Sequence, residues 1–358
     1  AGHAVVRNTF ICVVDESSAS DDDEASPRCR ASTDGLALLA GRRDEATVEL
    51  APLEVYSAAV AEHHVAPEAS EAAADEVEEA VVRQLLTDMR AGGALADAAV
   101  DQVCDLAGTL SFDILGCQVV LSAMELATPA QVRRLLGGLV ALPQMARSSR
   151  ASVALVQALQ VAPRDAAPVI AAGLLGEGAA VSAHISGCTV VCALIEQWSA
   201  EPSVAAFTDE VLALDIGGLV CHKFGHRVAL AILQFGLNRH VAMVTAKLRT
   251  NLPRYSRHRF ASLVLREALA HAPTADARGL GVELMRAPGA ATSLACHSFG
   301  TQVVRALLKL PGIGEQVLQF LVKGQRRVRK DRYGMMLLTE LGIEDGEHVQ
   351  IAAFTGGA

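Results

Sequence analysis

Histidine and cysteine residues at helical spacing are the first feature of this sequence that could support chemistry. One group is His184, Cys188 and Cys192, and a second is Cys221, His222 and His226. On a helix, this spacing places imidazole and thiol groups on one face, where they could bind zinc. The competing interpretation is that they are packed or surface residues of a repeated element. It is favoured because other copies of that element carry residues that bind no metal at the positions of Cys188 and Cys192.

Enzymatic chemistry finds less support. No nucleophile elbow, phosphate-binding loop, HExxH sequence or paired-carboxylate motif accompanies these residues. His222, His258 and His297 recur in the same local context, which predicts a packing or surface role rather than a unique catalytic one. We therefore expect no catalytic residues, no metal, no cofactor and no enzymatic activity.

The context that recurs is a short segment found along most of the chain. The clearest copies are HKFGHRVALAILQFG from His222, HRFASLVLREALA from His258 and HSFGTQVVRALLK from His297, and further copies start at Asp113, Ser149 (a weaker one), His184 and Asp331. The residue after the Gly or Ala defines a first position, held in order by Cys117, Ser152, Cys188, His226, Ser262, Thr301 and Met335. These positions are 35, 36, 38, 36, 39 and 34 residues apart. Such a period is typical of a solenoid, in which each unit buries its apolar face against its neighbours.

One copy shows how these segments would be positioned. On a helix, His226, Arg227 and Leu230 fall within an arc of about 100°, and the apolar Val228 and Ile232 lie on the other side. Stacked units would therefore present a row of such triplets. Proline recurs between the copies and is expected to separate one helix from the next. These prolines are Pro129, Pro143, Pro163, Pro202, Pro253, Pro273, Pro288 and Pro311, with Gly residues among them.

The amino-acid composition is typical of packed helices and indicates the cellular compartment in which we expect the protein. Hydrophobic residues make up 51% of the 358 residues and aromatic residues only 4%, so Ala, Leu and Val supply the apolar surface. The sequence has no run of about 18 uncharged apolar residues and no secretory signal pattern. Its eight cysteines lie mostly inside the repeats, without a disulfide-like framework. We expect an intracellular, cytoplasmic monomer with reduced thiols.

Charge divides the chain into regions. Residues 1–100 carry 20 acidic and 7 basic residues, 101–217 carry 11 and 5, and 218–335 carry 5 and 19. A basic block within an acidic chain is typical of nucleic-acid binding, although a solvated surface could show it too. Residues 1–70 are predicted to form a disordered acidic tail. Residues 71–94 are predicted to form a helical cap or degenerate repeat, and residues 95–350 the repeat domain.

The repeated segments resemble the Pumilio (PUF) repeat family. The resemblance is carried by HKFGHRVAL, HRFASLVLR and HSFGTQVVR, in which an aromatic residue and Gly or Ala precede two variable, two apolar and one variable residue, and it covers roughly residues 95–342. It implies an all-α, right-handed solenoid of about seven to eight three-helix repeats, whose concave face binds single-stranded RNA with the 5′ end at the C-terminal repeats.

The resemblance also assigns roles to residues of each repeat. The implied edge-reading pairs are Cys117/Leu121, Ser152/Val156, Cys188/Cys192, His226/Leu230, Ser262/Arg266, Thr301/Arg305 and Met335/Thr339. The implied stacking residues are Gln118, Val153, Thr189, Arg227, Leu263, Gln302 and Met336. Among the cations of the basic block, Lys223, Arg257, Arg259 and Lys330 are expected to contact phosphates.

This sequence departs from the family pattern at the positions that would choose bases. No third position carries Gln or Glu, and Leu121, Val156 and Leu230 cannot form a hydrogen bond with a base edge. Only Ser262/Arg266, which the family pattern pairs with cytosine, and Thr301/Arg305 are plausible pairs. We expect RNA binding with low or partial specificity, carried by the C-terminal repeats, in post-transcriptional regulation of mRNA. The alternative is a scaffold for proteins, docking at the tail or the N-terminal repeats, or for structured RNA without sequence choice, with a nucleolar location as in ribosome assembly.

Overall fold

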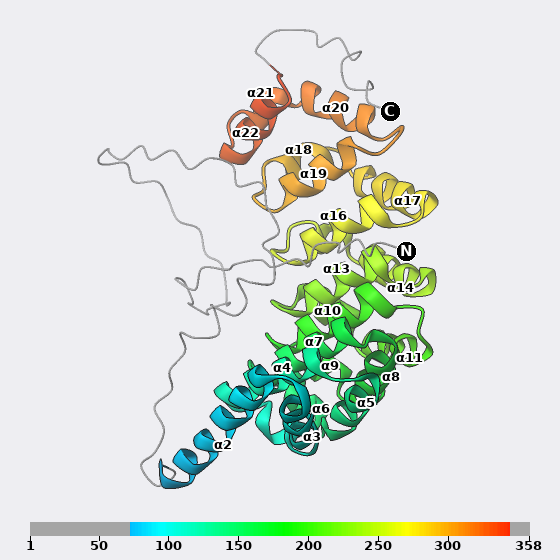
Figure 1. Ribbon diagram of the computed structural model, residues 1–358. Helices are drawn as coiled ribbons and strands as arrows, with labels where there is room; N and C mark the ends of the chain where they lie inside the picture. Colours follow the sequence, from blue (N-terminus) through cyan, green and yellow to red (C-terminus); the bar gives the residue numbers. More distant parts are fainter. Residues whose placement is uncertain (1–71, 344–358) are drawn as a thin grey trace, which may run out of the picture. The chain divides into compact units, whose positions relative to one another are not determined.

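The computed structural model describes residues 72–343, with side chains from residue 79 onward. The predicted acidic tail over 1–70 lies outside these residues, as do residues 344–350 of the predicted repeat domain. Helices are the only regular elements of the described chain (Figure 1). None of them is both long and apolar enough to cross a membrane. The expectation of an all-α solenoid is confirmed.

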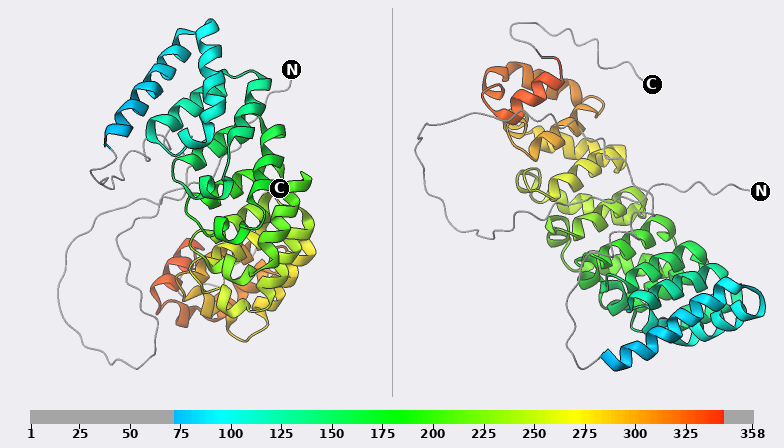
Figure 2. Two further views of the ribbon diagram at one scale, coloured as in Figure 1. Left: turned by 90° about the horizontal axis from the view of Figure 1, so that it is seen from below. Right: turned by 60° about the vertical axis from the view of Figure 1, so that its left-hand side comes forward.

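Each repeat contains an inner helix that starts near its first position. These inner helices are α4 (Ile114–Leu126), α7 (Ala151–Val161), α10 (Gly187–Trp198), α13 (Gly225–Phe235), α16 (Ala261–His271), α19 (Gly300–Leu308) and α22 (Arg332–Glu340). Each packs against the inner helix of the next repeat, so they form one continuous row (Figures 1 and 2). The row places the first positions of neighbouring repeats side by side.

A second row of helices backs the first. The outer helices are α5 (Pro129–Gly138), α8 (Pro163–Leu174), α11 (Pro202–Ala213), α14 (Asn238–Arg249), α17 (Thr274–Met285) and α20 (Gly314–Lys323). Proline occupies the first turn of α5, α8 and α11, where its missing N–H would have no helical partner. The prolines between copies therefore start helices as well as separate them.

Short linker helices connect the two rows. They are α6 (Leu142–Arg147), α9 (Gly178–Ser182), α12 (Ile216–Cys221), α15 (Leu252–Tyr255), α18 (Ala290–Ala295) and α21 (Gln325–Val328). Each runs from the C-terminal end of an outer helix to the N-terminal end of the following inner helix. The linker helices and the loops beside them therefore line one edge of the solenoid, which we call the cap edge. Its segments are 111–113, 139–150, 175–186, 214–224, 250–260, 286–299 and 324–331.

The N-terminal end is built from two longer helices. Helix α2 (Ala72–Ala91) and α3 (Gly93–Leu110) pack against each other and against α4. Val82, Leu85 and Met89 bury the inward face of α2. These two helices cover the first inner helix, as a terminal unit of a solenoid must do to keep its end apolar surface from water.

The core lies between the inner and outer rows. Leu135, Leu155, Phe207 and Ile232 are fully buried there, and one apolar cluster extends from Val82 to Ile343. Glycine at the start of inner helices has a steric cause, because a Cβ on Gly300 would lie 2.5 Å from the Leu294 carbonyl oxygen. Ala151 and Ala261 occupy the same place in two repeats. The preceding linker helix therefore lies closer to the start of the inner helix in some repeats than in others.

Candidate functional site

All seven inner helices of the described chain begin with a side chain that accepts hydrogen bonds from the first backbone N–H groups. The Asp113 carboxylate accepts from the Gly116 N–H at 2.7 Å, and Asp331 accepts from the Tyr333 and Gly334 N–H groups at 2.9 and 3.1 Å. Ser148 accepts from two N–H groups in the second repeat. These side chains satisfy donors that a helix leaves without internal partners. The weaker sequence copy is therefore aligned from Ser148, one residue before Ser149.

Histidine performs the same task in the four middle repeats. The Nδ1 atoms of His222, His258 and His297 each accept two backbone N–H groups at 3.2–3.4 Å. His184 Nδ1 accepts one, from Ser186, at 3.2 Å. An accepting Nδ1 requires a neutral ring with its proton on Nε2. The recurring histidine is thus a helix cap, which explains why it recurs at one position.

Burial favours the neutral form of these caps. It lowers the pKa of His184, His258 and His297, and a nearby arginine lowers each further: Arg147, Arg254 and Arg257 respectively. A protonated ring would present a donor to backbone N–H groups that also donate. The capping geometry therefore depends on the imidazoles staying neutral.

The first positions are mostly turned away from solvent, contrary to the expectation that they are presented. Buried residues hold this position in five repeats: Cys117, Ser152, Cys188, Ser262 and Thr301. The Ser262 hydroxyl donates to the Arg259 carbonyl oxygen at 3.4 Å, and the Thr301 hydroxyl donates to that of Ser298 at 3.0 Å. Tight stacking of neighbouring inner helices covers these short side chains. The helical arc places these side chains on one face of each helix but does not show how close the next helix comes.

Two thiols follow the same pattern. Cys117 Sγ donates to the Arg150 carbonyl oxygen at 3.4 Å, and Cys188 Sγ donates to that of Ile185 at 3.2 Å. Burial raises the pKa of Cys117 to about 11 and also raises the pKa of Cys188 and Cys192. These thiols stay protonated. Among the described residues, no three His, Cys, Asp or Glu side chains form a group that could hold a metal ion.

His226 is half-buried and packs against the next repeat. Its ring stacks on the Phe260 ring with centroids 4.8 Å apart and planes inclined by 24°. Its Nδ1 donates to the His222 carbonyl oxygen at 3.1 Å, and burial lowers its pKa. The ring therefore ties α13 to α16 rather than projecting from the row.

The third positions divide the row into two parts. Leu121, Val156 and Leu230 are half-buried against the core, and Cys192 is fully buried. These apolar residues are packing residues and offer little surface to a partner. Thr339, at the C-terminal end, is exposed and donates to the Met335 carbonyl oxygen.

The arginines at the third position are half-buried and already paired. Arg305 contacts both carboxylate oxygens of Glu340 on α22, with Nε–Oε1 at 3.1 Å and Nη2–Oε2 at 2.8 Å. Arg266 donates weakly to Gln302 at 3.4 Å and lies 3.5 Å from Glu267. Either arginine must leave its present partner within this chain before it can bond to a base and discriminate between bases.

The second positions offer few surfaces for stacking. Gln118 and Met336 are exposed, as is Met335 at the neighbouring first position, whereas Val153, Thr189, Leu263 and Gln302 are half-buried. Arg227 is the only planar cation at a second position, and its Nη1 lies 3.6 Å from Cys188 Sγ. Burial raises the pKa of the neighbouring Glu196 to about 7, against the opposing effect of Arg227. The arginines of the inner-helix row therefore have contacts within the protein.

The cap edge of the C-terminal repeats is different. Nine cations lie there: Lys223, Arg254, Arg257, Arg259, Arg286, Arg326, Arg327, Arg329 and Lys330. Arg329 donates to the Ile343 carbonyl oxygen at 2.6 Å, and the other eight form no ion pair with a described residue. Lys223 Nζ and the Arg259 guanidinium each lie 5.3 Å from the centroid of the following Phe ring, and Arg257 Nη2 donates to Ser293 at 3.0 Å. All four cations expected to contact phosphates belong to this edge.

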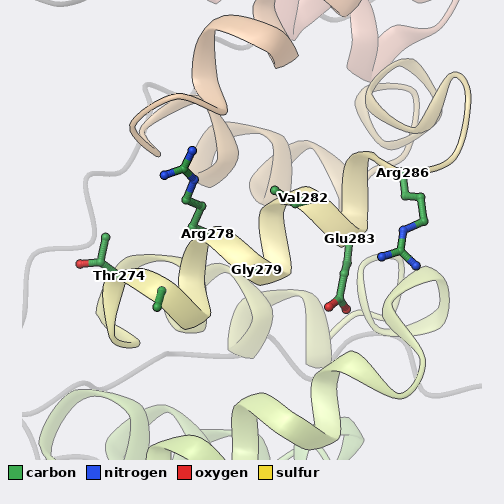
Figure 3. A pocket seen from close by; sticks show the side chains of 7 residues that line it. Thr274, Arg278, Gly279, Val282, Glu283 and Arg286 are labelled. Carbon is green, nitrogen blue, oxygen red and sulfur yellow. The ribbon is translucent and has the colours of Figure 1, made fainter.

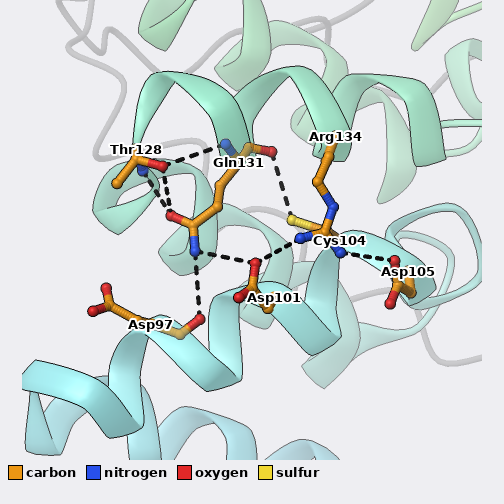
Figure 4. Close-up of polar contacts among 7 residues, drawn as sticks. All are labelled: Asp97, Asp101, Cys104, Asp105, Thr128, Gln131 and Arg134. Carbon is orange, nitrogen blue, oxygen red and sulfur yellow. Dashed lines mark hydrogen bonds and ion pairs between the residues drawn. The ribbon is translucent and has the colours of Figure 1, made fainter.

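Several cations on the outer helices form ion pairs within the protein. Arg134 of α5 contacts Asp101 and Asp105 of α3 at 2.7 and 3.1 Å, beside a capping box formed by Thr128 and Gln131 (Figure 4). Arg239 and His240 of α14 contact Asp209 of α11, and Arg249 contacts Asp276 of α17. These pairs join one repeat to the next. The eight cap-edge cations make no such pairs, although single cations such as Arg278 and Lys323 on outer helices also form none with a described residue.

A surface pocket on α17 provides no alternative site. It is lined by Thr274, Ala275, Arg278, Gly279, Val282, Glu283 and Arg286. All seven residues belong to one helix or its C-terminal cap, and Arg278 and Arg286 lie at opposite ends of it (Figure 3). A pocket with one wall cannot enclose a ligand.

Comparison with solved structures identifies the fold as that of Pumilio RNA-binding domains. PUF-8, in complex with PBE-RNA, matches with a TM-score of 0.65 and 13% identity over 81% of this chain and 88% of its own. The Puf3 RNA-binding domain, bound to Cox17 RNA 3′ UTR recognition sequence site A, has a TM-score of 0.63 and 19% identity over 80% and 90%. Yeast Puf5p, bound to MFA2 RNA, has a TM-score of 0.59 and 16% identity over 73% and 79%.

The family resemblance seen in the sequence is therefore confirmed at the level of the fold. No protein-family model and no curated protein matches the sequence.

Proposed function

We propose that this chain binds single-stranded RNA with its C-terminal repeats, residues 218–343, mainly through the phosphate backbone. The observation that carries this proposal is the row of eight cap-edge cations that form no ion pair with a described residue. RNA phosphates would release counterions from such a row, which makes affinity high at low salt and insensitive to sequence. The RNA-bound PUF structures of similar fold support the choice of ligand.

Base choice would be confined to Arg266 and Arg305. Each would leave its carboxylate or amide partner to contact a base edge, so that discrimination stays small. Met335, Met336 and Arg227 would supply the exposed or planar surfaces beside the bases. Regulation of mRNA through its 3′ untranslated region, in the cytoplasm, is the cellular role that we propose with this activity.

A second candidate is a scaffold that binds structured RNA without sequence choice, with a nucleolar location. The observation that favours it is the burial of five first positions, since a ligand held only by phosphates need not be single-stranded.

Fluorescence anisotropy with labelled 12-nucleotide RNA tests both candidates. We expect binding at 50 mM salt, with log affinity falling by about 3 per tenfold increase in salt, for roughly four phosphate contacts on a single strand. A hairpin of equal length should bind more weakly. Tighter binding of the hairpin would select the scaffold, and no detectable binding of either RNA at low salt would refute both.

A further inference from the structure

The cap edge of the N-terminal repeats carries an apolar surface that the RNA-binding proposal does not use. Val140, Leu175 and Leu214 follow the ends of the outer helices α5, α8 and α11 and are 61%, 46% and 68% exposed. Ile114 and Ile185, at the starts of α4 and α10, are 49% and 54% exposed. Leu175 and Leu214 directly follow their helices, whereas Val140 is the second residue after α5 and comes after the buried Leu139. Scattered exposed apolar side chains are common, but a group beside the ends of outer helices in consecutive repeats marks an interaction surface.

Direct contacts place the loops of this row next to one another. The Gly176 and Gly178 N–H groups, which follow Leu175, donate to the Glu210 carboxylate near the end of α11 at 2.7 and 2.8 Å. Arg147 of α6 contacts Glu177 before α9 at 3.3 Å. Neighbouring helices pack at about 8–10 Å, so Val140, Leu175 and Leu214 form a row with about that spacing.

Charge around the row is mixed near α6 and acidic near the end of α11. Asp113, Glu177 and Asp215 are exposed on this part of the cap edge, while Arg147 pairs with Glu177 and Arg150 is half-buried. Asp215 adjoins Leu214, and its carboxylate forms no ion pair with a described residue and caps no helix N–H. A partner for this surface therefore needs apolar side chains flanked by Lys or Arg.

The row ends where the basic edge begins. The residues that follow the outer helices α14 and α17 are Thr250 and Arg286, and Lys223 and Arg259 occupy the places of Ile114 and Ile185. The apolar positions on the concave face cannot serve the same partner, since Leu121 and Val156 pack against the core. Leu126, Val161 and Val169 are also exposed on these repeats, but they lie away from the cap edge.

We propose that this row is the docking site for a basic amphipathic helix of a protein partner. In such a helix, residues seven apart lie about 10.5 Å apart on one face, which matches the spacing of stacked repeats. Leu or Ile at these positions would contact Val140, Leu175 and Leu214, and Lys or Arg beside them would face Glu177 and Asp215. Helix-in-groove recognition uses this kind of apolar periodicity.

Selection of peptides from a phage-displayed library of random 20-residue sequences on the whole chain tests the site. We expect enriched peptides with apolar residues seven apart and flanking Lys or Arg. Synthetic copies should bind the Val140→Gln, Leu175→Gln, Leu214→Gln triple variant at least about tenfold more weakly. The matched control is Val282→Gln on α17, 53% exposed, which should bind normally. Thermal unfolding of both variants checks that the fold is intact.

Three outcomes would overturn the proposal. One is the enrichment of no peptides, or of peptides that bind the triple variant as tightly as the control. Another is enrichment of peptides without basic residues or apolar periodicity. The third is a concentration-dependent dimer in sedimentation that the triple variant abolishes, because a second copy would then cover the row. Labelled RNA should bind the triple variant normally, which separates this test from that of RNA binding.

Discussion

The N-terminal three repeats and the C-terminal four share one scaffold and carry opposite surfaces. Each repeat starts its inner helix with a capping side chain and packs the same apolar face. The residue after the cap is Ile114 or Ile185 in the first and third repeats but Lys223 or Arg259 in the fourth and fifth. Positions that stack the repeats and positions that face solvent are therefore independent, so one solenoid can present two partners with different surfaces.

The largest effect should come from neutralising cap-edge cations of the C-terminal half. The Lys223→Gln, Arg259→Gln, Lys330→Gln triple variant should bind labelled single-stranded RNA roughly 100-fold more weakly at 50 mM salt, with a salt slope smaller by about 2. The control changes three N-terminal arginines that form no ion pair among the described residues: Arg133, Arg150 and Arg164. Equal losses of RNA affinity in the two triple variants would show that the two halves do not differ in RNA binding.

The shared scaffold predicts equal effects in the two halves. A Cβ on Gly116 would lie 2.4 Å from the Leu110 carbonyl oxygen, and one on Gly300 would lie 2.5 Å from that of Leu294. Gly116→Ala and Gly300→Ala should each lower the free energy of unfolding by about 2 kcal/mol in urea titrations.

The matched control is Ala261→Gly, which should lower the free energy of unfolding by only about 1 kcal/mol. A loss after Gly116→Ala that is much smaller than the loss after Gly300→Ala would show that the two halves do not share the same inner-helix start.

Acid should weaken the histidine-capped repeats, three of which lie in the C-terminal half. The pKa of His258 and His297 is lower in the folded protein than in the unfolded chain. The unfolded state therefore binds more protons, and stability is fully present above the unfolded pKa of about 6.5 and lost as pH falls below it. His297→Asp, which copies the cap at Asp331, should retain about 1 kcal/mol more of the free energy of unfolding than the wild type between pH 7.5 and 5.

Thermal unfolding at both pH values measures this difference, and Gln as the replacement at His297 is the control for loss of the imidazole. If the wild type lost no more stability than His297→Asp between pH 7.5 and 5, neutral imidazole caps would be ruled out.

The smallest effect concerns base choice within the C-terminal half. Glu340→Gln removes the ion pair of Arg305 and should raise RNA affinity by about two- to fivefold, in line with the strength of an exposed pair. Arg305→Ala and Arg266→Ala should lower affinity and reduce any base preference. Anisotropy with four RNAs that differ at one base reads both effects, and an unchanged preference in both Ala variants would remove Arg266 and Arg305 as sources of specificity.

The sequence predicts the architecture because the same packing residues recur in every repeat. The spacing from Cys117 to Met335 locates all seven inner helices of the described chain, and the recurring His222, His258 and His297 mark their starts. The burial of Ser262 and Thr301 could not be predicted, because it depends on how closely the next inner helix stacks. The pairing of Arg305 with Glu340 links residues 35 apart in two repeats, and local patterns do not show such contacts.

The cap edge was partly predictable. The four expected phosphate contacts lie on it, since charge counts reveal a basic block wherever it folds. Its apolar half was not foreseen, because Val140, Leu175 and Leu214 stand beside helix ends, where neither a helical period nor a repeat motif distinguishes an exposed residue from a buried one.

The ion pairs between outer helices also have a mechanical consequence. They link α11 to α14 and α14 to α17, and within the described chain none links α17 to α20. Among the described residues, ion pairs are also missing between α5 and α8 and between α8 and α11, but α17 and α20 are the least closely packed of these neighbouring outer helices. We therefore expect the solenoid to bend most easily at the joint after α17. Bending at that joint would change the pitch of the last two repeats with little strain elsewhere. Arg326, Arg327 and Lys330 would move together with these repeats. Their distance from Lys223 would then change to match the length of the bound strand.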